Sequence, residues 1–295
     1  FKRIKTELTN SIMNIQKIVT SSSYAGIGDQ YLMLFMEYCD YSFDEWLDKI
    51  SGINELSLNS ALFQIIVGLT KLETYGIIHN VLHIHNILIR ESKETFNLRY
   101  NVNKIIYQLS SDYLFIISDF GRSLIMTDDA FIEHYGSFVI TNLSPRLITY
   151  YNDSSNQQKA ITNLSTNPKY YKQFLHSFDI FFIMLTILYK IYSILTSDKI
   201  SKSIFDILFS IPHEYVNLSE VIVSGSDKLK DIISQIDKNV PSHLKEIINK
   251  MKTIMKCAYD DLTIGLTSKK GAYKIQAYPR DLIKTYFSEF KVDEL

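Results

Sequence analysis

Apolar residues recur at helical spacing over much of the chain, and this pattern predicts a mostly helical body. From residue 3 to residue 19 they return about every 3.6 residues, as on one face of an amphipathic helix. Gly76 follows the apolar stripe of residues 58–75, at a place where helices commonly end. Helices are predicted over residues 3–19, 43–50, 58–75, 178–195, 202–210, 226–236, 241–259 and 280–289.

Short apolar runs between these helices predict strands. Residues 31–36, 87–89 and 113–117 are each short, apolar and bounded by polar residues, which is typical of buried strands. Residues 91–112 are mixed and polar and are interpreted as an inserted loop, and residues 121–171 follow no clear period. The pattern predicts an α+β fold without an internal repeat or an interdomain linker.

Composition and charge favour a packed globular domain. The chain has 295 residues, 46% of them hydrophobic, and its formal net charge is −1. A pI near 6.7 indicates no excess of positive charge that would bind nucleic acid or an anionic membrane, so neither partner is expected. Cys39 and Cys257 lie too far apart in the sequence for a zinc knuckle, and no disulfide framework is indicated, so a reducing compartment is expected.

The most apolar stretch is predicted to be a buried helix, with no membrane span in the chain. It runs from Phe178 to Tyr189, contains Asp179 and stops at Lys190, whereas a span needs about 18 residues with few or no charges. The sequence has no signal-peptide pattern. These features predict a cytoplasmic protein.

Two short strings carry the candidate chemistry. Residues 79–88 read His-Asn-Val-Leu-His-Ile-His-Asn-Ile-Leu, and residues 118–121 read Ser-Asp-Phe-Gly after a strand-like apolar run. In this order they resemble the catalytic loop and the metal-binding loop of protein kinases. The resemblance implies a protein-kinase-like α+β fold, with a partial small lobe at 1–36, a hinge at 37–42 and a helical large lobe at 43–295.

The resemblance also implies ATP and Mg²⁺ as cofactors. Asn86 and Asp119 match the family's magnesium ligands, and their side-chain oxygens suit this cation. On the adenine side, the resemblance makes Met36 the gatekeeper. The backbone of Glu37 and Cys39 would form hydrogen bonds with adenine, and Leu88 would form the apolar floor beneath it. An ordinary buried strand leaving the core is the alternative interpretation of the hinge run.

Two acidic residues have supporting roles in the resemblance. Glu7 matches the helix glutamate that pairs with the phosphate-binding lysine, although exposed helices commonly carry such a residue. Asp179 matches the aspartate that braces the catalytic-loop backbone; the alternative is a charge at a helix N-terminus. The family's glycine-rich loop and lysine strand would precede Phe1, so weak ATP binding is expected of this chain.

Several positions depart from the family's pattern. Val81 stands where an aspartate would accept the proton of the substrate hydroxyl, and valine has no polar atom for this role. Asn80 replaces the usual arginine, so switching by a phosphate is not expected. Arg146, in Ser144-Pro145-Arg146, replaces the glutamate that closes the activation segment.

The histidines of the first string admit two interpretations. His79 matches the family's packing histidine. His83 stands where a phosphate-contacting residue is usual, and it alone favours a small-molecule kinase of the aminoglycoside or choline type. Without a third partner, His83 and His85 are interpreted as surface or core histidines that bind no metal.

The predicted function is that of a pseudokinase or a very weak kinase that docks a protein partner. The alternative is an active Ser/Thr-type kinase that transfers the ATP γ-phosphate to hydroxyls of a protein substrate. The Asn-, Ile-, Lys- and Tyr-rich composition resembles that of kinases from large DNA viruses, which would place the protein in the host cytoplasm or the virion. Nothing in the sequence indicates a particular oligomeric state.

Overall fold

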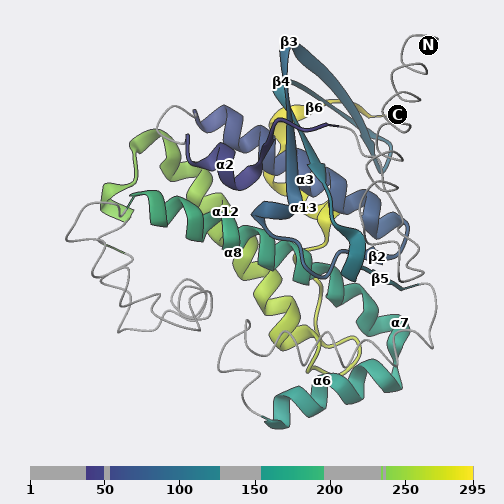
Figure 1. Ribbon diagram of the computed structural model, residues 1–295. Helices are drawn as coiled ribbons and strands as arrows, with labels where there is room; N and C mark the ends of the chain where they lie inside the picture. The colour runs from purple at the N-terminus through teal and green to yellow at the C-terminus, as the bar shows by residue number, and fades with distance from the viewer. Residues whose placement is uncertain (1–37, 50–53, 127–153, 196–233, 235–236, 295) are drawn as a thin grey trace, which may run out of the picture. The chain divides into compact units, whose positions relative to one another are not determined.

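The computed structural model describes residues 38–49, 54–126, 154–195, 234 and 237–294. The chain separates into two compact units, Phe1–Tyr38 and Cys39–Leu295, and the fold below is that of the second (Figure 1). Several predictions therefore fall outside the described residues, namely the helices at 3–19 and 202–210, most of the helix at 226–236 and the strand at 31–36.

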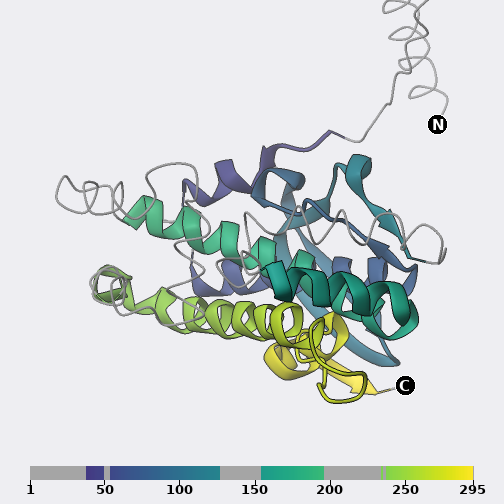
Figure 2. The same cartoon turned by 90° about the horizontal axis from the view of Figure 1, so that it is seen from below.

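Three long helices form the centre of the described fold. They are α3 (Glu55–Thr74), α8 (His176–Leu195) and α12 (Lys245–Asp260), and they agree closely with three of the predicted helices. α8 and α12 lie side by side in both views (Figures 1 and 2). Because α8 is apolar around most of its circumference, it is buried on most sides, and it forms the middle of the core.

Shorter helices complete the described helical part. They are α2 (Phe43–Leu47), α6 (Ser154–Thr166), α7 (Pro168–Tyr171), α13 (Pro279–Tyr286), the 3₁₀ turns η4 (Lys172–Leu175), η6 (Ser242–Leu244) and η8 (Ser288–Phe290), and the π-helical turn η7 (Asp261–Gly265). α6 and α7 lie where no regular structure was predicted. α6 buries only Ala160 and Leu164, so its sequence carries little apolar periodicity.

The main sheet of the described residues is antiparallel, with strand order β1-β3-β4-β6. Its strands are β1 (Tyr41–Ser42), β3 (Ile87–Val102), β4 (Ile105–Ile117) and β6 (Lys291–Glu294). A separate antiparallel ladder pairs β2 (Ile77–Ile78) with β5 (Leu124–Ile125). Helices together with antiparallel sheets confirm the predicted α+β class.

Residues 91–112 form most of a long β-hairpin, so the prediction of an inserted loop is wrong. β3 and β4 meet at Asn103–Lys104, whose φ angles of 52° and 68° are the positive values of a tight hairpin turn. Tyr100 and Tyr107 pack against Phe63 of α3, with ring centroids 5.6 and 5.8 Å away. Polar residues outnumber the apolar ones in this stretch and the turn lacks glycine, so the local sequence resembles a loop.

The apolar stretch around α8 is a core helix, as predicted. Among the described helices, only the stretch Pro168–Leu195 is long and apolar enough to cross a membrane, with a mean hydropathy of 1.8 in its most apolar window. In that window, 72% is buried inside the protein. Such burial is expected of the central helix of a globular domain.

Candidate functional site

The first string forms a loop that is held by a buried carboxylate. His79 and Asn80 follow β2, and both donate their backbone N–H groups to Asp179 near the start of α8. The N–H of His79 lies 2.7 Å from Oδ2, and that of Asn80 lies 2.8 Å from Oδ1. Asn80 has a φ of 70°, in the left-handed region that asparagine tolerates better than most residues. Asp179 thus makes the bracing contact predicted for it.

Asp179 is enclosed by protein, with only 1% of its surface exposed. Burial raises the pKa of Asp179 to about 7, and the N–H groups of His79 and Asn80 oppose this rise because they favour the charged form. Each carboxylate oxygen receives one of these N–H groups. The loop and the helix therefore depend on each other for satisfied hydrogen bonds.

The second string meets the first through Ser118, the residue after β4. Its backbone N–H and its Oγ–H both donate to the carbonyl oxygen of Asn86, at 2.8 and 3.0 Å. The carbonyl oxygen of Ser118 in turn accepts a 2.7 Å hydrogen bond from Nε2 of His79. Asn86 ends the 3₁₀ turn η2 (Ile84–Asn86) and precedes β3, so the start of β3 and the end of β4 place Asn86 beside Ser118, the residue before Asp119.

The side chain of Asn86 has a fixed orientation. Its Nδ2 donates to the carbonyl oxygen of Val81 at 2.9 Å, and only the NH₂ end of the amide can make this bond. The Oδ1 atom is therefore the end available to a ligand. Asn86 is only 7% exposed, and no described residue donates a hydrogen bond to this oxygen.

Asp119 is the second of the two residues that the sequence assigned to a metal ion. It is exposed, has a left-handed φ of 61° and is followed by the 3₁₀ turn η3 (Phe120–Arg122). A Cβ atom at Gly121 would lie 3.3 Å from Oδ1 of Asp119, so glycine keeps space beside the carboxylate.

Within the described ranges, no three His, Cys, Asp or Glu side chains gather into a metal site. A cation held by Asn86 and Asp119 would thus need oxygens from water and from a ligand. Mg²⁺ bound with phosphates commonly has this coordination, so the residues present fit Mg²⁺ carried by a nucleotide.

Val81 and the three histidines of the first string belong to the same loop as Asn86. Val81 is half-buried, and only its backbone takes part in the loop's hydrogen bonds. His79 is fully buried and packs on Phe120 at a centroid distance of 5.1 Å; burial lowers its pKa. The ring of His83 lies 5.5 Å from that of His85 and 6.4 Å from that of Phe182.

The residues predicted for the adenine side are only partly described. The N–H of Asp40 donates to the carbonyl oxygen of Ile89 at 2.8 Å, and Ser42 pairs with Leu88 in the sheet. Cys39, the residue before Asp40, thus runs beside the strand that carries Leu88, and both side chains are half-buried. Met36, Glu37 and Glu7 lie outside the described residues, as does the segment Ser144-Pro145-Arg146.

A second buried carboxylate, Asp261 in η7, was not predicted from the sequence. It is completely buried and accepts three hydrogen bonds, from Oγ of Ser177 at 2.8 Å and from the N–H groups of Gln276 and Ala277 at 2.8 and 2.7 Å. Burial raises its pKa. Because Ser177 is in the same first turn of α8 as Asp179, these contacts support the brace of the loop. The local signal is only an acid that follows an amphipathic helix.

His176, the first residue of α8, predicts a loss of stability in acid. Burial lowers its pKa from 6.5 to about 4, so the folded protein resists its protonation. This stability is present above pH 6.5 and is lost as the pH falls towards 4, by up to about 3 kcal/mol. In urea unfolding between pH 7 and pH 4, His176→Phe is expected to flatten this acid decline. His243→Phe, at an exposed position, controls for the change in net charge; an equal flattening there would contradict the assignment.

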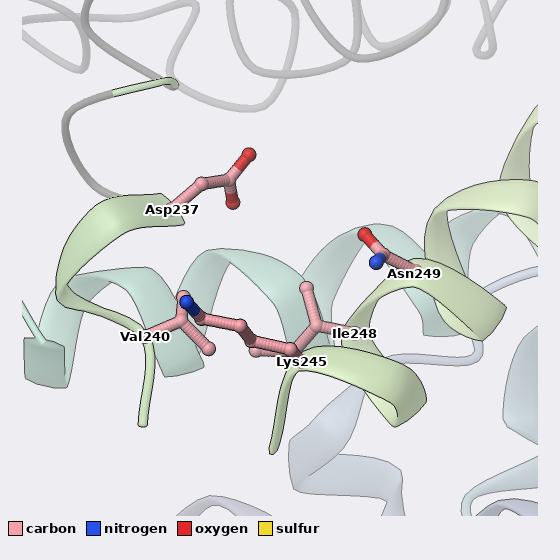
Figure 3. Close-up of a pocket in the computed structure, with 5 residues that line it drawn as sticks. All are labelled: Asp237, Val240, Lys245, Ile248 and Asn249. Atoms are coloured by element: carbon pink, nitrogen blue, oxygen red, sulfur yellow. The ribbon is translucent and has the colours of Figure 1, made fainter. Parts of the chain in front are cut away.

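A cavity of about 120 Å³ lies at the start of α12, away from the two strings (Figure 3). It is lined by Asp237, Val240, Lys245, Ile248 and Asn249. The carboxylate of Asp237 already accepts hydrogen bonds from Nζ of Lys252 at 2.7 and 2.8 Å and from the hydroxyl of Tyr192 at 2.9 Å. None of the residues in the two strings lines this cavity.

Comparisons of the chain with protein-family models, with curated proteins and with solved structures find no match. A functional interpretation therefore depends on the contacts just described. Together they connect the segments that carry Asn86 and Asp119 to a loop that is braced from the core.

Proposed function

We propose that this chain is a protein-kinase-like domain that binds a magnesium–nucleotide complex weakly, transfers phosphate poorly or not at all, and acts by docking another protein. The observation that carries the proposal is the double hydrogen bond from Ser118 to the carbonyl oxygen of Asn86. This bond supports a common site for Asn86 and Asp119, which stand in separate motifs of the sequence.

The chemistry of the donor set favours a hard cation. Asn86 Oδ1 and the carboxylate of Asp119 would hold Mg²⁺, and phosphate and water oxygens would complete its shell. When bound, Mg²⁺ neutralises phosphate charge. The chain's own part is to orient these two oxygens, through the Asn86–Val81 and Ser118–Asn86 hydrogen bonds.

The absence of a carboxylate at residue 81 favours a binding role over efficient catalysis. A valine side chain can neither accept nor orient a hydroxyl proton. His79 is committed to the carbonyl oxygen of Ser118 and is buried, so it is a poor substitute. An active Ser/Thr-type kinase is the second candidate, favoured by the intact contacts around Asn86 and Asp179.

Asp119→Ala is expected to abolish the magnesium-dependent part of nucleotide binding, because it removes the exposed carboxylate of the pair. Thermal unfolding of the chain would be followed with ATP alone and with ATP plus Mg²⁺. A ligand at one hundred times its Kd stabilises a fold by about 2.7 kcal/mol. The wild-type chain should gain more stability from ATP when Mg²⁺ is present, and Asp119→Ala should lose this additional gain.

The matched control is Asp112→Ala, which removes an exposed carboxylate of β4 that bonds Thr95 and lies outside both strings. It should retain the magnesium-dependent gain. A wild-type chain whose melting temperature does not respond to millimolar Mg-ATP would disprove the proposed nucleotide site.

A further inference from the structure

A buried glutamine of α3 takes the place of a neighbouring strand at one edge of β4. Nε2 of Gln64 donates to the carbonyl oxygen of Tyr113, and the N–H of Phe115 donates to Oε1 of Gln64, each at 3.1 Å. The C=O of Tyr113 and the N–H of Phe115 are the groups that a further strand would bond at this edge. Gln64 is only 4% exposed, so both ends of its amide need these partners.

The same face of α3 approaches the last residue of β4. Gly68 lies one helical turn after Gln64, and a Cβ atom there would lie 2.8 Å from Cδ1 of Ile117. The missing side chain therefore permits the close approach of helix and strand. Gln64 and Gly68 together hold the final residues of β4, immediately before Ser118 and Asp119.

We propose that Gln64 is a positioning residue for Asp119: its amide fixes the end of β4, and with it the place of Asp119 beside Asn86. The inference rests on the proposed function for its metal-binding consequence. Its structural part concerns only the strand end. Ser118 couples the two parts, because it follows the strand held by Gln64 and donates both its backbone and its side-chain hydrogen to Asn86.

A second amide on the same helix offers a matched control. Nδ2 of Asn59 donates to Oε1 of Glu289 at 2.7 Å, and its Oδ1 accepts from Nζ of Lys250 at 2.9 Å. Asn59 is 9% exposed and its partners lie in the C-terminal part of the fold, so it makes no contact of this kind with β4. Asn59→Leu and Gln64→Leu both remove a buried amide from α3, but only the second frees the strand end.

The first test is amide hydrogen exchange of the ligand-free chain. Gln64→Leu should accelerate exchange in peptides covering residues 113–121 at least tenfold, on the order expected when a supporting contact is lost. Asn59→Leu should leave these peptides unchanged, even where both variants lower the melting temperature. Unchanged exchange in Gln64→Leu, or equal acceleration in both variants, would overturn the inference. If Gln64→Leu fails to fold, Gln64→Glu, which keeps the acceptor for Phe115, replaces it.

The second test measures the affinity for ATP with and without Mg²⁺. Gln64→Leu should lower the magnesium-dependent affinity by about tenfold, as supporting residues of metal sites commonly do, and leave the metal-free affinity unchanged. An equal loss with and without Mg²⁺ would contradict a positioning role. A third outcome is that exchange at residues 113–121 accelerates in Gln64→Leu while Mg-ATP leaves the wild-type melting temperature unchanged. That result would contradict the proposed function and still support the positioning of the strand end by Gln64.

Discussion

Val81→Asp is expected to raise phosphotransfer from ATP to a protein hydroxyl by about 100- to 10,000-fold, the usual contribution of a positioned general base. The residue is half-buried in a loop, so a carboxylate here keeps contact with water. The backbone of the loop does not depend on the valine side chain, because Asn86 bonds the carbonyl oxygen of residue 81 and Asp179 holds the preceding residues. Transfer of labelled phosphate to a generic protein substrate would measure the gain.

Two further variants serve as controls for Val81→Asp. Val81→Asn has nearly the shape of the aspartate but no basic oxygen, and should stay silent. Val81→Asp combined with Asp119→Ala should lose the gain, because the proposed metal ligand is then missing. A gain in Val81→Asn equal to that in Val81→Asp would contradict a base at this position. Strong wild-type activity that Asp119→Ala removes would favour the active kinase.

Asp179→Ala is expected to destabilise the fold by about 2 to 6 kcal/mol, since it leaves two buried N–H groups without partners at about 1 to 3 kcal/mol each. These are the N–H groups of His79 and Asn80. The loss should be larger at pH 5 than at pH 8. Burial raises the pKa of Asp179 to about 7, so the wild-type stability from this group is present at low pH and declines as the pH rises through 7. The alanine variant lacks this decline.

Urea unfolding at both pH values measures the effect. Ser177→Ala, in the same turn of α8, is the comparison, because it removes one of the three donors to Asp261 and leaves the two backbone donors in place. Its cost should be smaller. A loss below about 1 kcal/mol in Asp179→Ala would show that the two N–H groups find other partners, and the brace would then be unnecessary.

Local pattern was sufficient for the features whose signal repeats along one element. The apolar stretches of α3, α8 and α12 exceed a dozen residues each, and their length and periodicity predict helices. The end of α3 was equally local, because Gly76 has a φ of 64° that glycine adopts without strain. The two strings and the valine within the first were likewise visible without any structure.

Prediction failed where the signal was short or mixed. The β3–β4 hairpin has alternating exposure, but exposed charged residues such as Lys93, Glu94 and Arg99 conceal its period. Its inner face is defined by Phe63, which belongs to another element. A strand of this kind is stable only because a helix covers one side of it. The residues of the strand do not indicate which helix that is.

The sequence by itself determined the α+β class, the long helices, the candidate residues Asn86 and Asp119 and the absence of a carboxylate at residue 81. Only the tertiary structure decided that Ser118 joins the two strings, that Asp261 supports the helix carrying Asp179, and that Gln64 completes the edge of β4. The physical reason is the distance along the chain over which each kind of signal extends. Periodicity reports the side of an element that avoids water, whereas a buried polar group is satisfied by whichever distant donor or acceptor the packed fold brings to it.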